Sequence, residues 1–190
     1  MLYIFSEARL YLYQILFITN LIKINFMKKI STLFAFLMAT TFVIAQEKYT
    51  AENEGWLVNV DQAYALSQKT GKPIMANFTG SDWCGWCKKL TANVFSKPEF
   101  KKWANDNVVL LELDFPRRKQ IPNEIRQQNY SLQQAFQVRG YPTVWIFNLE
   151  KNTAGEGYSI EALGQTGYTP TVQQFTSGAD QILGRAAKGG

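Results

Sequence analysis

The order of its apolar runs constrains the fold of this chain more than any other feature of the sequence. Runs at residues 73–79, 108–114 and 142–148 are short and rich in branched or aromatic side chains, as buried strands are. Segments of helical pattern separate them, and residues 158–164 can return as a hairpin partner of the third run. Because strands that alternate with helices build α/β folds, this order predicts a central mixed sheet with helices on both faces.

The first expected helix lies just before the first strand. Asp61 is expected to cap its N-terminus, and Gly71 is expected to end it. Three of its side chains are expected to face inward: Ala63, Ala65 and Leu66. Further helices are expected at 84–94, from 98 onward, at 124–136 and at 169–183. The loop at 115–124 carries a basic run, at 117–119, that is expected to be solvated.

The composition of the chain excludes several classes of active site and of binding partner. Its 190 residues, 46% of them hydrophobic, suit one globular domain with a core. The chain contains no histidine, which excludes Ser-His-Asp, Cys-His and His-metal schemes within it. The net charge is +5, but residues 46–190 hold 16 basic and 14 acidic residues, and the basic ones are dispersed. We therefore expect no nucleic-acid partner.

Residues 27–45 have the pattern of a signal peptide. Two lysines precede a short apolar run, and Val43 and Ala45 occupy the positions that signal peptidase reads. The pattern predicts cleavage after Ala45 and a periplasmic or secreted protein. Residues 1–26 read as translation from an upstream start; if they are translated, anchoring to a membrane by this segment is the alternative. The expected divisions are a leader at 1–45, an N-terminal arm at 46–58, a domain at 59–186 and a tail at 187–190.

The only two cysteines of the chain, Cys84 and Cys87, are three residues apart. A zinc site needs four ligands, and the chain supplies two thiolates, so no metal is expected, although a site shared between two chains stays open. A structural disulfide is a second alternative, but a two-residue spacer restrains the unfolded chain very little. The third alternative is a redox couple.

The redox alternative fits the local chemistry of the expected helix. Cys84 lies at its first turn, where unpaired N–H groups favour a thiolate and lower the pKa of a thiol. Cys87 lies one turn on and can attack a mixed disulfide formed at Cys84. Cys84 is therefore expected to be the exposed nucleophile and Cys87 the deeper resolving thiol. Trp83 and Trp86 are expected to frame a site for extended polypeptide, with a core position as the alternative for Trp86.

Two segments carry a resemblance to a known family. The sequence "WCGWCK", residues 83–88, resembles the active site of the thioredoxin superfamily, and "VRGYPTVWIF", residues 138–147, resembles its segment with a cis-proline. The surroundings look closest to exported bacterial thioredoxin-like proteins. The resemblance extends over residues 61–183 and implies the thioredoxin fold.

The family resemblance also implies a function and a set of site residues. It implies thiol–disulfide exchange with protein thiols or disulfides, by a monomer without a cofactor, and an envelope or membrane redox partner. Pro142 would face the cysteines, and the backbone at Tyr141 would pair with a bound substrate strand. The expected site residues are Cys84 and Cys87 for catalysis and Trp83, Gly85, Trp86, Tyr141 and Pro142 for substrate binding. The alternatives are a binding module with a passive disulfide and a reductase for one partner, such as a cytochrome-maturation client.

The sequence departs from this family at its proton relay. Asn77 stands where cytosolic thioredoxin has a buried aspartate, and Leu110 stands where the neighbouring strand has a lysine. Glu112 and Asp114 are weak candidates for a replacement base. The spacer between the cysteines is Gly-Trp rather than Gly-Pro, so the sequence predicts neither a reduction potential nor a direction of electron flow.

Overall fold

A computed structural model describes residues 49–152 and 157–189, together with five isolated positions between 17 and 27. The expected leader and its cleavage site lie outside the described residues, apart from those five positions. The segment from Tyr49 onward forms one compact unit. Within the described residues, no helix is both long and apolar enough to cross a membrane.

Four strands form one mixed sheet in the order β2-β1-β3-β4. Their bounds are β1 Ile74–Thr79, β2 Val109–Asp114, β3 Thr143–Lys151 and β4 Tyr158–Thr166. Strand β1 pairs with β2 in parallel and with β3 in antiparallel, and β3 forms the expected hairpin with β4. All six residues of β1 are buried, because this strand lies inside the sheet and both its faces are covered.

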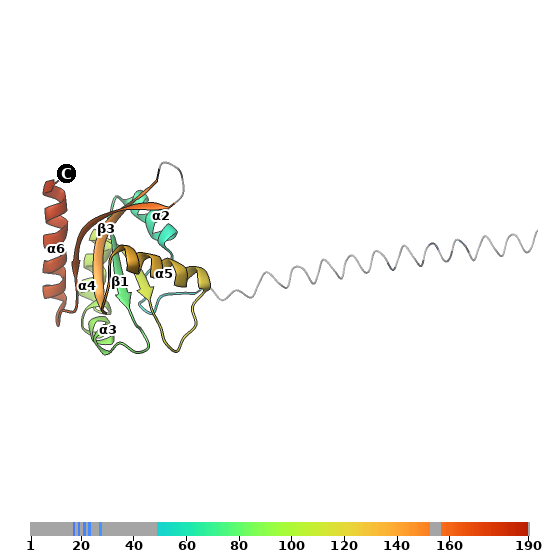
Figure 1. The fold of residues 1–190 in the computed structure, drawn as a ribbon, viewed down its shortest axis with the longest axis horizontal. Helices are drawn as coiled ribbons and strands as arrows, with labels where there is room; N and C mark the ends of the chain where they lie inside the picture. Colours follow the sequence, from blue (N-terminus) through green and yellow to red (C-terminus); the bar gives the residue numbers. More distant parts are fainter. Residues whose placement is uncertain are drawn as a thin grey trace, which may run out of the picture. The chain divides into compact units, whose positions relative to one another are not determined.

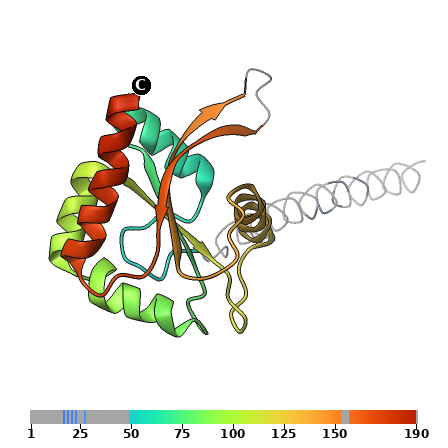
Figure 2. The same ribbon diagram turned by 60° about the vertical axis from the view of Figure 1, so that its left-hand side comes forward.

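Helices cover both faces of the sheet, as the sequence predicts. Their bounds are α2 Val60–Thr70, α3 Gly85–Leu90, α4 Pro98–Asn107, α5 Asn123–Ala135 and α6 Val172–Gly189. A π-helical turn at Thr91–Phe95 follows α3 directly. Figures 1 and 2 show α6 and α5 on opposite sides of the sheet. One hydrophobic core joins the sheet to α3, α4 and α6, and a second joins it to α2 and α5.

Several expected details of the helices are wrong. Asn59 caps α2 by accepting from the Gln62 N–H, whereas Asp61 accepts from the Tyr158 hydroxyl. Ala63 is buried as predicted, but Ala65 and Leu66 are exposed, because Ser67, one turn after Ala63, shares its inward face. Helix α6 continues beyond the expected end at 183 to Gly189.

The described part of the expected arm packs against the edge of the sheet. The Leu57 N–H donates to the Leu110 carbonyl, and the Glu112 N–H donates to the Leu57 carbonyl. These bonds add a single parallel bridge beside β2. Trp56 is buried against Phe95 and Phe100. The arm therefore contributes both backbone pairing and core, although its composition is largely polar.

Candidate active site

Strand β1 and helix α3 place the two cysteines side by side. The chain leaves β1 at Thr79, turns at Gly80, and reaches Cys84, which is the N-cap residue of α3. Cys84 and Cys87 form a disulfide, and the Cys87 N–H donates to Cys84 Sγ at 3.1 Å. A backbone N–H at a helix start thus points at the sulfur that the sequence predicts to be the nucleophile, which favours negative charge there.

The disulfide is less exposed than predicted. Cys84 is 6% exposed and Cys87 is 3% exposed, so the expectation of an exposed Cys84 is wrong for this oxidised form. Cys84 Sγ lies 3.7 Å from the Tyr141 carbonyl oxygen. The Tyr141–Pro142 bond is cis, as the resemblance implied, and it directly precedes β3. The segment that holds the cis-proline therefore contacts Cys84 through the Tyr141 carbonyl.

Trp83 is fixed by three neighbours. Its Nε1–H donates to the Phe115 carbonyl at 2.9 Å, and its ring meets the Tyr141 ring edge-on at 5.8 Å between centroids. The Arg117 guanidinium lies over the ring, 3.9 Å from its centroid. Gly80 permits this arrangement, because a Cβ there would come within 2.5 Å of the indole. Trp83 thus lies directly beside Cys84 in a defined position.

Trp86 is an exposed surface residue. It is 56% exposed, so the alternative that it belongs to the core is wrong. Its ring lies 4.9 Å from the Tyr168 ring, and Lys89 Nζ lies 4.4 Å from its centroid. Gly85 is also exposed, with open space where a Cβ would stand. An accessible aromatic side chain therefore lies between the two cysteines in the chain, and its neighbours differ from those of Trp83.

Asp82 lies in the turn between β1 and α3, called the active-site turn below, and it connects this turn to the basic loop at residues 115–124. The sequence did not reveal this connection. Its carboxylate accepts from the backbone N–H groups of Arg117, Arg118 and Lys119, at 2.6 to 3.2 Å. Desolvation acts against ionisation, but these hydrogen bonds outweigh it and lower the pKa of Asp82. Only the fold brings Asp82 and the loop together, since more than 30 residues separate them. Residues 117–119 are exposed, as expected for a solvated run, although the Arg117 guanidinium also lies over the Trp83 ring.

Buried polar groups lie under the site, in β1 and β2. Asn77 pairs in register with Glu112, and Thr79 pairs with Asp114. Asn77 Oδ1 is buried without a hydrogen-bond partner in the described part of the chain. Glu112 accepts from the N–H of Glu52 and from the backbone and side-chain N–H groups of Asn53. Burial, with a smaller contribution from Asp114, raises the pKa of Glu112.

The Asp114 carboxylate is also occupied. It accepts from the Ser81 N–H at 2.8 Å and from the Ser81 hydroxyl at 2.6 Å. No three His, Cys, Asp or Glu side chains of the described residues gather as metal ligands.

Comparison with known proteins agrees with this geometry. Residues 60–177 match the family described as "Thioredoxin-like domain". The chain is 35% identical to "Disulfide bond reductase DsbH" of Chlamydia pneumoniae over 113 residues, which are 59% of this chain and 67% of that protein. A solved structure named "DsbH Oxidoreductase" has a TM-score of 0.59 and 29% identity, covering 73% of this chain and 92% of that one.

A second relative is much longer than this chain. "Thiol:disulfide interchange protein DsbD" of Klebsiella pneumoniae is 32% identical over 100 residues, which are 53% of this chain but 15% of that protein. The likeness to DsbD therefore concerns one segment of that protein. The fold, the cysteine pair and these relatives agree: the chain belongs to the thioredoxin-like domain family and is a thiol–disulfide oxidoreductase of the DsbH and DsbD type.

Proposed function

We propose that this chain is an exported reductase of protein disulfides. The observation that carries the proposal is the Cys84–Cys87 disulfide at the start of α3, with Cys84 Sγ beside the Tyr141 carbonyl. The name of the relative DsbH, a disulfide bond reductase, supports the reducing direction. The exposed Trp86 and the backbone of residues 141–142 offer an apolar surface and hydrogen-bonding groups to an extended substrate.

The reaction proceeds in two exchanges. The Cys84 thiolate attacks one sulfur of a substrate disulfide, and the other substrate sulfur leaves as a thiolate. The Cys87 thiolate then attacks Cys84 Sγ, which forms the Cys84–Cys87 disulfide and releases the second substrate thiolate. Two electrons pass to the substrate, and its two thiolates take up the two protons that the protein thiols lose. A dithiol partner in the envelope or its membrane then restores both thiols.

Two measurements on the purified protein test this function. The reduced protein is expected to reduce insulin disulfides catalytically when a dithiol regenerates it. Its potential, measured in glutathione buffers, is expected below about −200 mV, on the side of thioredoxin rather than of an oxidant near about −120 mV. A potential near the oxidant's value would contradict the reducing direction. A stable dithiol that reduces no protein would favour the alternative of a binding module.

Export is the part of the proposal that rests on the leader. Val43 and Ala45 support cleavage after Ala45, with Gln46 as the first mature residue. Mass spectrometry of the protein isolated from the cell envelope or the medium is expected to find this N-terminus. A protein that keeps Met1 or Met27 and sediments with membranes would instead support an N-terminal anchor.

A further inference from the structure

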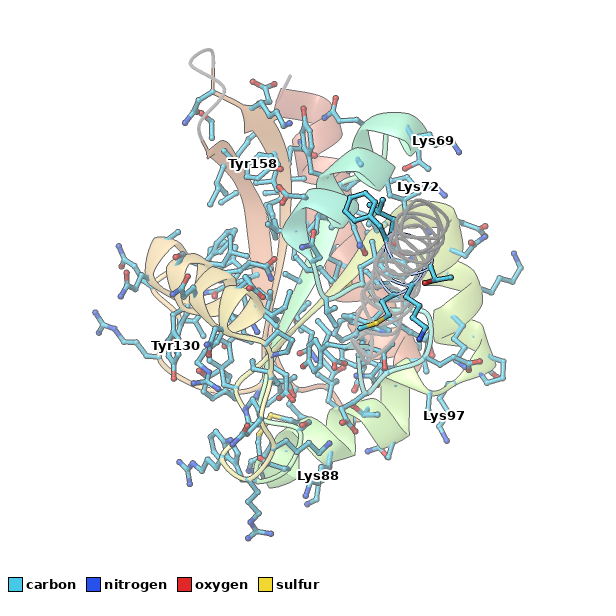
Figure 3. The ribbon with its side chains drawn as sticks, turned by 90° about the vertical axis from the view of Figure 1, so that its right-hand side faces the viewer. Lys69, Lys72, Lys88, Lys97, Tyr130 and Tyr158 are labelled. Carbon is cyan, nitrogen blue, oxygen red and sulfur yellow. A yellow bond between two sulfur atoms is a disulfide. The ribbon has the colours of Figure 1, made fainter. Side chains whose placement is uncertain are left out.

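Four basic residues contact the turn before α3 or the tryptophans next to the two cysteines, three through their side chains and one through its backbone N–H. They are Lys88, Lys89, Arg117 and Arg118, named the basic rim below. Lys88 Nζ donates to the Asp82 carbonyl, and Lys89 lies over Trp86. Arg117 lies over Trp83, and the Arg118 N–H donates to the Asp82 carboxylate. Figure 3 shows Lys88 at the end of the molecule that holds the disulfide.

No carboxylate of the described residues neutralises the basic rim through an ion pair. The three ion pairs of that part of the chain use Lys101, Lys102 and Lys119. The acidic groups nearest the rim accept hydrogen bonds from neutral donors: Asp82 from backbone N–H groups and Asp114 from Ser81. The four basic side chains of the rim thus outnumber these two carboxylates, and none of the four is in an ion pair with a described carboxylate.

Contacts with the active-site turn fix the position of the loop that carries Arg117 and Arg118. Three hydrogen bonds from the loop to Asp82 fix its backbone, and the Trp83 ring supports the Arg117 guanidinium. A polar pocket of about 380 Å³ adjoins the loop; its lining includes Arg117, Arg118, Arg126 and the Asp114 carboxylate. Because the Arg117 guanidinium is held over Trp83 before a partner arrives, less conformational entropy is lost on binding than with a free side chain.

We propose that the basic rim recognises an extended protein segment in which aspartate or glutamate residues flank the reactive disulfide. The inference rests on the proposed function and names its substrate class. A strand rises about 3.3 Å per residue, so acidic side chains within a few residues of a cysteine bound at Cys84 lie within reach of long arginine and lysine side chains. Charges of opposite sign also speed the encounter, by about 10-fold or more at low salt.

The test compares peptides that differ only in charge. Each carries one disulfide, flanked by aspartate in the first peptide, serine in the second and lysine in the third. Reduction by the reduced protein is followed at about 10 mM and about 1 M salt, where the Debye length is about 30 Å and about 3 Å. Each rate constant is divided by that for dithiothreitol at the same salt concentration; its attacking thiolate is an anion like that of Cys84, so the ratio removes the intrinsic reactivity of each peptide toward a thiolate.

We expect the aspartate peptide to react about 10-fold faster than the serine peptide at low salt, and the lysine peptide to react slowest. The advantage is expected to fall toward 1 at high salt. In the double variant Arg117→Gln/Arg118→Gln, the aspartate-to-serine ratio is expected to approach 1 at low salt. The matched control Lys69→Gln/Lys97→Gln removes the same charge from other exposed positions and is expected to keep the wild-type ratio; Figure 3 shows Lys69 far from Lys88.

The outcomes separate this inference from the proposed function. Equal rates for the three peptides at low salt would overturn the inference and leave the proposed function standing. A ratio that falls equally in both double variants would also overturn it, because net charge rather than the basic rim would then be responsible. Failure to reduce any peptide would contradict the proposed function, and this inference with it. The salt series on the wild type gives a result even where a variant does not fold.

Discussion

Glu112 is a carboxylic acid buried under the N-terminal arm, and only 1% of it is exposed. Both its oxygens accept hydrogen bonds from the arm, yet burial still raises the pKa above the ordinary 4.5. The pKa of Tyr49, in the same arm, is raised as well. Burial is the largest cause of this shift, followed by the negative charges of Asp114 and Glu112. Holding Glu112 ionised therefore costs the folded state free energy at neutral pH.

Replacing Glu112 with glutamine tests this cost. Since the folded-state pKa is raised, the stabilising contribution of Glu112 is fully present below about pH 4.5 and is lost as pH rises through the folded pKa. We therefore expect the wild type to lose stability relative to Glu112→Gln as pH rises from about 4.5; that is, the unfolding free energy of the wild type minus that of the variant should decrease. Urea denaturation across pH 4–8 measures it. A difference that is constant, or that moves the other way, would contradict the assignment.

Gly80 controls where Trp83 lies. A methyl group at this position would meet the indole at 2.5 to 2.8 Å, so Gly80→Ala is expected to displace the ring from the Phe115 carbonyl and from Cys84. We expect disulfide reduction to slow by about 10-fold or more, because small displacements at a reacting centre are costly. Gly178→Ala in α6, where a Cβ meets open space, is the control. Equal reduction rates in the two variants would show that the position of Trp83 does not matter.

At the scale of elements, Asp82 joins the turn before α3 to the loop between β2 and α5. The loop has no helix or strand of its own, and three of its N–H groups depend on this one carboxylate. Because Asp82 is ionised at neutral pH, with its pKa lowered, the connection persists until the pH falls below the ordinary 3.8. Asp82 thus adds to the contacts that Trp83 makes with the same loop, through the Phe115 carbonyl and the Arg117 guanidinium.

Asp82→Ala is expected to free these amides. Hydrogen exchange at Arg117, Arg118 and Lys119 should become faster, while the amides of β1 keep their wild-type protection, since they belong to the sheet. Amide exchange at neutral pH, followed by mass spectrometry or NMR, checks this. If the three loop amides exchange as slowly as in the wild type, another contact must hold the loop.

The elements predicted best are those whose pattern is local. The four strands and the order of the helices follow from apolar runs and from start signals such as Pro98. The face of α2 that is buried was harder to predict. Ala65 and Leu66 are as apolar as Ala63, and only the packing of α2 on the sheet decides which of them is buried. The hydrogen bonds from the loop to Asp82 could not be predicted, because their donors are backbone N–H groups distant in sequence from Asp82.

At the scale of the whole molecule, the sheet separates two cores. Phe175 of α6 is fully buried in one of them, with its ring 5.4 Å from Phe95 and 5.6 Å from Phe100. These contacts link the last helix to the segment that follows the cysteines. The composition predicts a domain with a hydrophobic core, but only the packing shows that residues 95, 100 and 175 meet in it.

Phe175→Ala is expected to destabilise the protein by about 3–5 kcal/mol, through lost transfer free energy and a cavity. Leu66→Ala serves as the comparison, because Leu66 is 41% exposed, and its cost should stay below about 1 kcal/mol. Urea denaturation of both variants checks the order. A larger loss for Leu66→Ala would mean that the phase of α2 is wrong.

Disulfide exchange is expected to begin at Cys84 and to be completed by Cys87. Trapping measures this directly: the reduced Cys84→Ser and Cys87→Ser variants are each mixed with a disulfide peptide, and the adducts are located by mass spectrometry. We expect Cys87→Ser to accumulate a mixed disulfide through Cys84, and Cys84→Ser to form almost none, because Cys84 is the N-cap residue of α3 and Cys87 lies within the helix. A rapid adduct at Cys87, with none at Cys84, would contradict the account.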